Sequence, residues 1–191
     1  LINPNNPCGS VCGPDDIDAL LAIARDFPNC IVVADEIYDG LDFTGEQVSV
    51  ASRSTDVTVI ALNGVSKVYY APGWRIGYMA LHDPQRRLTL VRDGLERLLR
   101  SRLCASTPAQ MGYLAGLEGD RGWMELYAQR VQQQRDHCLR RIQGIDGLEV
   151  EHPGGAFYMF IRLTDERWAA DDKAFVLDLL HEEHVLLVHG S

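Results

Sequence analysis

Lysine is scarce in this chain. Of its 18 basic residues, Lys67 and Lys173 are the two lysines and the others are arginines. The 27 acidic residues outnumber the basic ones, and the resulting net charge of −9 argues against partners such as nucleic acid or an anionic membrane surface. A lysine that is kept where arginine supplies nearly all other positive charge is a candidate for chemistry that needs an amine.

Cysteine pairs and long apolar runs are lacking as well. The five cysteines are an odd number without the spacing of a disulfide framework, which predicts a reducing compartment and a cytoplasmic location. No apolar run approaches the roughly 20 residues that span a bilayer. A zinc site needs closer cysteine pairs than this chain has, so we expect no metal at Cys8, Cys12, His181, His184 and His189.

Both ends of the chain have the character of buried strands. Residues 1–2 and 185–188 are apolar, whereas natural termini are usually frayed and polar. We therefore expect this chain to be an internal fragment of a longer protein.

The first part of the chain has the pattern of an α/β fold. A helix is expected from Pro14, because acidic residues follow at once and apolar residues recur on one face. Three short apolar runs, 31–34, 57–62 and 76–81, are typical of strands buried on both faces of a parallel sheet. This part therefore predicts a section of an open α/β layer.

The second part predicts a smaller α+β unit after a helical region. Helices are expected over residues 85–102, from Thr107, over 123–142 and over 171–181. Strands are expected over residues 148–150, 156–161 and 185–188. The helix over 85–102 carries an apolar stripe formed by Leu88, Val91, Leu95, Leu98 and Leu99. We predict two domains, residues 1–115 and residues 116–191.

Polar side chains follow the apolar runs of the larger predicted domain. Asn6 follows the apolar start of the chain, Asp35 and Tyr38 follow the run over 31–34, and Lys67 follows the run over 57–62. The intervals between them are close to one strand–helix–strand repeat of roughly 30 residues. Because the carboxyl ends of parallel strands share one sheet edge, where ligands bind, we expect these side chains to converge.

Together these side chains have the chemistry of a pyridoxal phosphate site. The Lys67 amine can form a Schiff base with an aldehyde, and an ionised Asp35 can hold a pyridine nitrogen protonated. Asn6 and Tyr38 can hydrogen-bond a ring phenolate, which keeps the pKa of the Schiff base low. Arg75 offers a planar fork for a phosphate. We therefore expect pyridoxal 5'-phosphate as the cofactor.

Four motifs, in this order, resemble those of the fold-type I, class I and II aminotransferases. They are residues 3–9 (Asn-Pro-Asn-Asn-Pro-Cys-Gly), 35–38 (Asp-Glu-Ile-Tyr), 66–67 (Ser-Lys) with 73–77, and 153–158. Within this family, the chain is most similar to prokaryotic, especially archaeal, alanine aminotransferases at residues 63–67, 102–104, 107–110, 176–181 and 189–191. The resemblance covers essentially the whole chain. It implies a fragment of the pyridoxal-phosphate-dependent transferase fold.

The resemblance also implies a role for each candidate residue. Lys67 is implied to bind the cofactor and to shift the proton during catalysis. Asp35 is implied to pair with the ring nitrogen, Asn6 and Tyr38 to contact the ring oxygen, and Arg75 to bind the phosphate. Asn6 is also expected to contact the substrate.

Three further positions depart from the family pattern or stay open. Gly64 stands where many members have a serine that also contacts the phosphate, and Cys8 stands where threonine is usual. Arg102 either forms a surface or intersubunit ion pair or binds the second carboxylate of a dicarboxylic substrate. The sequence does not distinguish between these two interpretations of Arg102.

The resemblance implies transfer of the amino group of L-alanine to 2-oxoglutarate, with small-molecule amino and 2-oxo acids as partners and a homodimeric full-length protein. Open alternatives are an aminotransferase with an aspartate or aromatic donor, a C–S β-lyase of the same fold, and an aminotransferase-like regulatory module. The retained Lys67, Asp35 and Arg75 favour an enzyme. The chain alone is expected to be inactive, because the family's N-terminal phosphate-binding turn, ring-stacking aromatic residue and C-terminal carboxylate-binding arginine have no counterpart in it.

Overall fold

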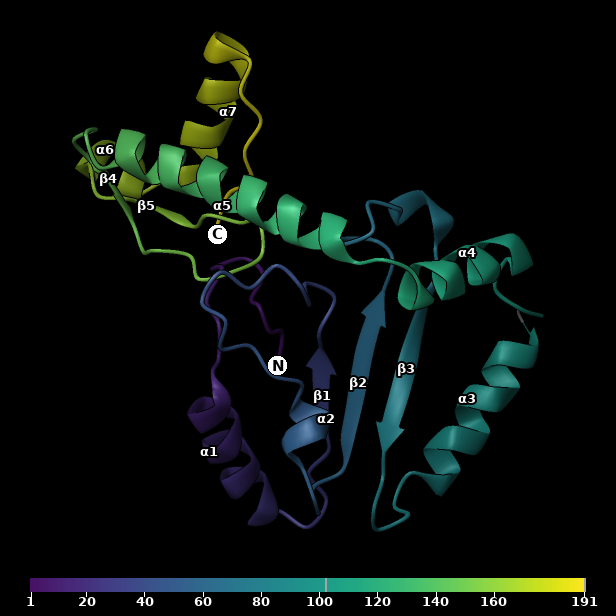
Figure 1. The fold of residues 1–191 in the computed structure, drawn as a ribbon. Helices are drawn as coiled ribbons and strands as arrows, with labels where there is room; N and C mark the ends of the chain where they lie inside the picture. Colours follow the sequence, from purple (N-terminus) through teal and green to yellow (C-terminus); the bar gives the residue numbers. More distant parts are fainter. Residues whose placement is uncertain (102, 191) are drawn as a thin grey trace.

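The computed structural model describes residues 1–101 and 103–190, which form two β-sheets connected by helices (Figure 1). The three-stranded sheet contains β1 (Val32–Asp35), β2 (Val59–Gly64) and β3 (Gly77–His82), and the two-stranded sheet contains β4 (Leu148–Val150) and β5 (Ile161–Leu163). The helices are α1 (Pro14–Arg25), α2 (Val50–Arg53), α3 (Thr89–Ser101), α4 (Thr107–Glu118), α5 (Gly122–Ile142), α6 (Glu166–Ala169) and α7 (Asp172–Glu183), with a short 3-10 helix η1 (Pro72–Trp74). None of these helices is long and apolar enough to cross a membrane within the part of the chain described.

Helix α1 begins at Pro14, where the sequence predicts, and ends at Arg25. Pro14 occupies its first turn, where a missing N–H costs nothing. The Asp16 carboxylate accepts a hydrogen bond from the Gly13 N–H at 3.0 Å, and its charge complements the helix dipole. Arg25 lies in the last turn, where a cation is favoured. The predicted helices corresponding to α4, α5 and α7 are confirmed as well.

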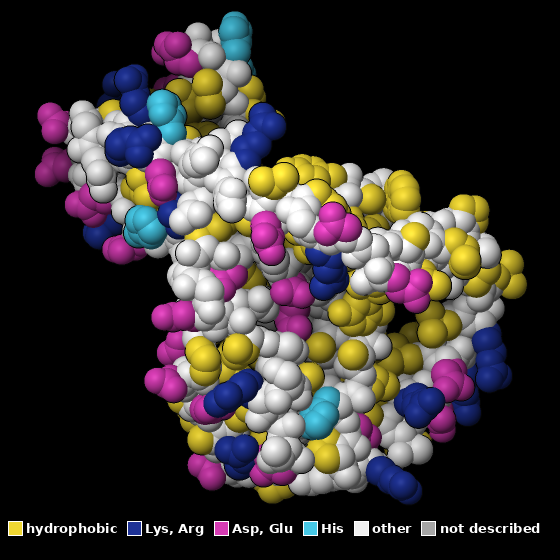
Figure 2. Space-filling view, viewed as in Figure 1, with side chains coloured by type: hydrophobic (Ala, Val, Ile, Leu, Met, Phe, Trp, Pro, Cys, Tyr) yellow, Lys and Arg dark blue, Asp and Glu magenta, His cyan; other side chains and the backbone are white. Residues whose placement is uncertain are grey.

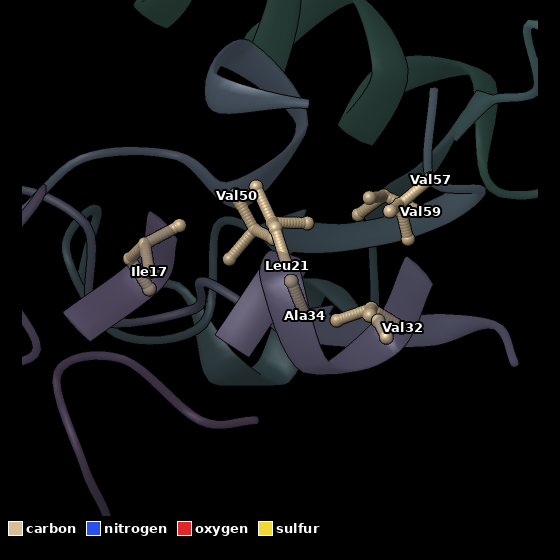
Figure 3. Packing of buried hydrophobic residues seen from close by; sticks show 8 residues of the cluster. Ile17, Leu21, Val32, Ala34, Val50, Val57 and Val59 are labelled. Atoms are coloured by element: carbon tan, nitrogen blue, oxygen red, sulfur yellow. The ribbon is translucent and has the colours of Figure 1, made fainter. Parts of the chain in front are cut away.

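A hydrophobic core joins α1 and α2 to one face of the three-stranded sheet. Its side chains point toward one another between the helices and the strands (Figure 3). Each large aliphatic side chain buried in this way contributes about 1.5–3 kcal/mol to folding. The buried members are Ile17, Leu21, Ala24, Val32, Ala34, Val50, Val57 and Val59. This core fixes β1 and β2, and with them the loops that follow these strands.

The prediction of three parallel strands buried on both faces is wrong in two respects. β1 and β2 are parallel, but β3 runs antiparallel to β2, with Gly77 opposite Gly64. The connection between β2 and β3 contains η1 and no long crossover helix, so it returns the chain in the opposite direction. β1 alternates between buried and less buried residues, and in β3 the side chains of Tyr78 and Met79 are 47% and 44% exposed.

Helix α3 is shorter than predicted, and most of the predicted apolar stripe is exposed. The Asp83 carboxylate accepts hydrogen bonds from the backbone N–H groups of Arg87 and Leu88, both at 2.8 Å, and so caps the chain before the helix begins at Thr89. Leu88 is buried, whereas Leu98 and Leu99 are 67% and 65% exposed. Within α3, Leu98 and Leu99 are therefore not covered by other described residues.

Two predicted strands of the smaller unit are also wrong. Only Ile161 of the predicted strand 156–161 belongs to a strand, β5, which pairs with β4 in antiparallel register. Ala156 has a positive φ of 56°, which interrupts the extended backbone of a strand. Residues 185–188 form no strand, and Val188 is 92% exposed. The backbone around Ala156 instead follows an irregular path against the loops of the other sheet.

Candidate active site

The predicted site residues lie at one edge of the three-stranded sheet. Asp35 is the last residue of β1, and Lys67 follows the last residue of β2 by three positions. Arg75 precedes Gly77, the first residue of β3, by two positions. Because β3 is antiparallel, its start lies beside the ends of β1 and β2, as the arrows in Figure 1 show. The antiparallel direction of β3 therefore brings Arg75 to the same edge. The rule for the carboxyl ends of parallel strands, on which the prediction from the sequence rested, does not cover this case.

The loop over residues 3–12 is fixed by its own side chains. Asn3 is buried and forms two hydrogen bonds with the backbone of Cys12, one from Asn3 Nδ2 to the carbonyl (3.0 Å) and one from the Cys12 N–H to Asn3 Oδ1 (2.9 Å). Gly9 has a φ of +69°, and a Cβ there would lie 2.6 Å from Pro153 Cβ. The Gly155 N–H donates to the Gly9 carbonyl at 2.9 Å. These contacts hold the loop, which carries Asn6, against residues 153–158.

Two polar groups contact the hydroxyl of Tyr38. Asn6 Nδ2 donates to Tyr38 Oη over 3.4 Å, and Tyr158 Oη lies 2.8 Å from the same atom. The Tyr38 side chain is 3% exposed, and its ring meets those of Phe157 and Tyr158 edge to face, with centroids 5.5 Å apart in each case. The structure thus brings Asn6 and Tyr38 together, as predicted from the sequence.

Burial raises the pKa of the Tyr38 phenol above its ordinary value. The next contributions are the hydrogen bond with Tyr158 and the proximity of that phenol, while the hydrogen bond from Asn6 acts in the opposite direction. The Tyr38 hydroxyl therefore keeps its proton throughout the physiological range. It can serve there as a hydrogen-bond donor to a ligand oxygen.

The Lys67 amine lies beside this aromatic group. Its Nζ is 5.8 Å from the centroid of the Tyr38 ring and 5.5 Å from that of Phe157. Contacts of this kind attract a cation by about 0.5–2 kcal/mol, whereas removing one partner of a buried ion pair costs about 3–5 kcal/mol. Across residues 1–101 and 103–190, no ion pair involves Lys67. The amine is half-buried and is not neutralised by a carboxylate of the described chain.

The adjacent carboxylates of Asp35 and Glu36 serve different ends. Asp35 Oδ1 accepts a hydrogen bond from the Ile37 N–H at 3.1 Å, which orients the side chain and leaves its second oxygen available. Glu36 is buried, and its Oε1 accepts from the N–H of Val50, the first residue of α2, at 3.0 Å. Burial raises the pKa of the Glu36 carboxyl. Glu36 therefore has a structural role, and Asp35 is the member of the pair left for a ligand.

Arg75 and Gly64 lie where β2 and β3 meet. Arg75 has a left-handed backbone with a φ of 53°, and its exposed guanidinium donates from Nη1 to the Pro72 carbonyl at 2.9 Å. Among the described residues the Arg75 side chain forms no ion pair and no other hydrogen bond, so the remaining N–H groups of its guanidinium are available to a ligand. A Cβ at Gly64 would lie 2.8 Å from the Ile76 carbonyl oxygen, so this site excludes the serine that many relatives have here.

Sequence reasoning missed two side chains of this site and named one that the structure does not describe. Phe157 and Tyr158 contact Tyr38, and the only signal for them was their place in the motif over residues 153–158. Arg102 lies outside the described residues. Its two readings therefore stay predictions.

Two hollows lie near α5. The smaller, of about 280 Å³, is lined by Tyr70, Phe157 and Tyr158 among others and so adjoins the site. The larger, of about 510 Å³, lies between α5 and residues 40–45. The larger hollow is lined by none of the predicted site residues, which are Asn6, Asp35, Tyr38, Lys67 and Arg75. We therefore assign it no part in the chemistry.

The donor set fits the predicted cofactor. An amine without an ion pair, a carboxylate with one oxygen available, two donors for a ring oxygen and an exposed guanidinium match the aldehyde, ring nitrogen, ring oxygen and phosphate of pyridoxal phosphate, respectively. These five residues need no metal ion for that match.

Comparison with known proteins points to one family. The family model "Aminotransferase class I and II" matches residues 1–191. The chain is 38% identical to the glutamate-pyruvate aminotransferase AlaA of Escherichia coli over 195 residues, which cover 100% of the chain and 48% of that protein. It is 34% identical to a probable aspartate aminotransferase of Methanocaldococcus jannaschii, covering 98% of the chain and 48% of that protein. The structure of an alanine aminotransferase from Pyrococcus furiosus superposes with a TM-score of 0.95 at 44% identity, covering 100% of this chain and 48% of that one. The chain thus spans about half the length of the relatives it matches.

Proposed function

Because the chain belongs to the class I and II aminotransferase family, we propose that it supplies the central cofactor-binding residues of an enzyme that transfers the amino group of L-alanine to 2-oxoglutarate, giving pyruvate and glutamate. The observation that carries this proposal is the Lys67 amine, which lies beside Tyr38 and Phe157 without an ion pair on the described chain. A lysine that serves only solubility keeps its amine in water, whereas the Lys67 amine lies close to the rings of Tyr38 and Phe157.

Pyridoxal phosphate, when bound, supplies an aldehyde that reacts with amino groups and a ring that accepts electrons. Lys67 would hold this group through its amine and would move a proton with Nζ during turnover. Asp35 would keep the ring nitrogen protonated through the carboxylate oxygen that Ile37 does not occupy. Removing one preorganised hydrogen-bond donor costs about 2.7–4 kcal/mol in activation free energy in other enzymes, and we expect a loss of this order when the Asp35 charge is removed.

The remaining residues bind and orient. Asn6 and Tyr38 would donate to the ring oxygen, and burial keeps the Tyr38 proton in place for this bond. Arg75 would hold the phosphate with the N–H groups that Pro72 leaves unused. The rings of Tyr38 and Phe157 would exclude water from the Lys67 amine.

The choice of L-alanine as donor is supported by the similarity to AlaA and to the Pyrococcus alanine aminotransferase. The similarity to a probable aspartate aminotransferase favours aspartate as the second candidate donor. A donor with a bare methyl group and an acceptor with a distal carboxylate must share one pocket, so an arginine that can withdraw suits both. Of the two interpretations of Arg102, the one in which it binds the second carboxylate of a dicarboxylic substrate supplies this role, and a variant distinguishes it from the ion-pair interpretation. The variant Arg102→Ala should then raise KM for 2-oxoglutarate about tenfold or more while leaving KM for L-alanine nearly unchanged.

Single-turnover kinetics of the full-length protein, loaded with pyridoxal phosphate, test the proposal. We expect L-alanine to convert the bound cofactor to its aminated form and to release pyruvate, with a larger rate constant per concentration than L-aspartate or L-phenylalanine. A faster reaction with L-aspartate would replace the proposed donor and leave the transaminase assignment intact. Absence of reaction with every amino acid would favour a regulatory module.

A further inference from the structure

The hydroxyl of Tyr158 has no part in the proposed function, yet it lies 2.8 Å from that of Tyr38. The two residues are 120 positions apart in the sequence, and their rings meet edge to face. The contact depends on the positive φ of Ala156, whose N–H donates to the Leu41 carbonyl at 2.7 Å and ties the segment to the loop after Tyr38. The fold thus holds the two hydroxyls together from both sides.

The hydrogen-bond capacity of Tyr38 makes this contact consequential. A phenol oxygen offers one proton and two lone pairs. Asn6 Nδ2, which can only donate, takes one lone pair of Tyr38 Oη over 3.4 Å. Tyr158 then takes either the second lone pair, as a donor, or the proton, as an acceptor, and the 2.8 Å distance allows both. This choice decides whether the Tyr38 proton is available to a ligand.

We propose that Tyr158 is a positioning residue that donates to Tyr38 Oη when the cofactor is bound, and that it thereby directs the Tyr38 proton to the ring oxygen of the cofactor. This inference rests on the proposed function. A charged ring oxygen is a stronger acceptor than a neutral phenol, so the Tyr38 O–H turns toward it and Tyr158 fills the vacated position. Both hydroxyls rotate, and no covalent bond forms or breaks.

Of the groups around the Tyr38 hydroxyl, Tyr158 is the one that can change from accepting the Tyr38 proton to donating its own. Lys67 Nζ lies 5.8 Å from the centroid of the Tyr38 ring, and among the described residues the hydrogen bonds of Tyr38 Oη are with Asn6 and Tyr158. The Asp35 charge acts on Tyr38 from a distance and favours its protonated form. Asn6 faces the hydroxyl but cannot accept through its Nδ2 group. Tyr158 can both accept and donate.

The test follows the visible absorption of the cofactor–lysine linkage against pH in the loaded full-length protein. A donor to the ring oxygen competes with the protonated linkage nitrogen for that oxygen, so a well-directed Tyr38 proton keeps the pKa of that nitrogen low. We expect Tyr158→Phe to raise the midpoint of this titration by about 0.5–1 pH. In a Tyr38→Phe background, Tyr158→Phe should add no further rise, because Tyr158 acts through Tyr38.

Tyr113→Phe is the matched control, because it removes the hydroxyl of another buried tyrosine and should leave the midpoint unchanged. An unchanged midpoint in Tyr158→Phe would overturn the proposal. A lowered midpoint would also overturn it, since Tyr158 would then be withdrawing the Tyr38 proton. If Tyr158→Phe does not fold, a fluorinated tyrosine at position 158, which is a stronger donor, should lower the midpoint, and a rise would contradict the inference. A failure of the unmodified protein to form any such band would contradict the proposed function instead.

Discussion

Tyr113 is a buried tyrosine whose titration makes the free energy of unfolding depend on pH. Burial raises the pKa of Tyr113 to about 12, whereas an unfolded tyrosine has a pKa of about 10. Between these values the folded state keeps a proton that the unfolded state loses. The stabilising contribution is therefore complete below a pH of about 10 and is lost as the pH rises through about 12.

Tyr113→Phe should flatten this alkaline loss of stability. Urea unfolding of the full-length protein, measured at neutral pH and again above a pH of about 10, gives the free energy of unfolding under both conditions. We expect the variant to lose less of it than the unmodified protein. Tyr70→Phe, at a tyrosine that is 62% exposed, is the control and should leave the loss unchanged. An equal loss in Tyr113→Phe would show that other groups govern the alkaline limit.

The neighbouring carboxylates Asp35 and Glu36 should respond differently to the same substitution. Asp35→Asn should slow the first half-reaction by about 3–4 kcal/mol of activation free energy, because the ring nitrogen loses its charged partner. Glu36→Gln keeps an acceptor for the Val50 N–H and should leave the rate within a few-fold. Single-turnover rates at equal cofactor occupancy measure both. A fast Asp35→Asn enzyme would remove Asp35 from the chemistry.

At the scale of elements, the pairing of β2 with β3 depends on the close approach of Gly64 and Gly77. A Cβ at Gly64 would lie 2.8 Å from the Ile76 carbonyl oxygen and 3.0 Å from Gly77 Cα, and both are backbone atoms that cannot swing away. Gly64→Ala should therefore destabilise the protein by about 1–3 kcal/mol, measured as a lower Tm. Gly94→Ala in α3 is the control.

Gly94 has no atom within 4 Å of its added Cβ, so alanine there should stabilise the helix by about 0.5–1 kcal/mol. Opposite signs for the two glycine variants are the expected result. A neutral Gly64→Ala would mean that β3 shifts without cost and does not fix Arg75 at the sheet edge.

Elements with a strong local pattern could be predicted from the sequence, and those set by distant contacts could not. Helix α1 carries its own start signals in Pro14 and in the acidic residues that follow it, among them Asp16. The direction of β3 depends on the connection before it, and its apolar run is the same for either direction. The bend at Ala156 is absent from any local pattern because its positive φ is held by the Leu41 carbonyl.

At the scale of the whole molecule, the sequence predicted which side chains share the edge of the sheet. It did not predict that Tyr158 packs against them. Asn6, Asp35 and Lys67 each follow an apolar run at regular intervals, so the topology of an α/β layer predicts that they share an edge. Tyr158 is 120 positions from Tyr38 in the sequence, and the residues immediately around Tyr158 form no strand. No periodicity in the sequence encodes such a contact. The division into residues 1–115 and 116–191 stays a prediction.

The surface of the described chain carries many exposed apolar side chains. Figure 2 shows hydrophobic side chains gathered at the upper right, over the region of α4. Met111 and Leu114 of α4 are 61% and 46% exposed, and Leu98 of α3 is 67% exposed. Among the described residues β3 is an edge strand of its sheet, with one side unpaired. Surfaces of this kind favour association.

Residues 1–191 produced alone should therefore self-associate and should not transaminate L-alanine. Sedimentation velocity over a range of concentrations measures the first property, and pyruvate release in the presence of pyridoxal phosphate measures the second. The full-length protein, which we propose to be a homodimer, is the control and should show one concentration-independent species. A monomeric, active preparation of residues 1–191 would contradict both expectations.

The most direct test of the account is the position of the cofactor on the chain. The full-length protein loaded with pyridoxal phosphate is reduced with borohydride, which fixes the cofactor to the lysine it occupies, and is then digested for peptide mapping by mass spectrometry. We predict the label on Lys67, with Lys67→Ala losing both the label and turnover while Lys173→Ala keeps both. A label on Lys173, or on any lysine other than Lys67, would contradict the assignment of this sheet edge as the active site.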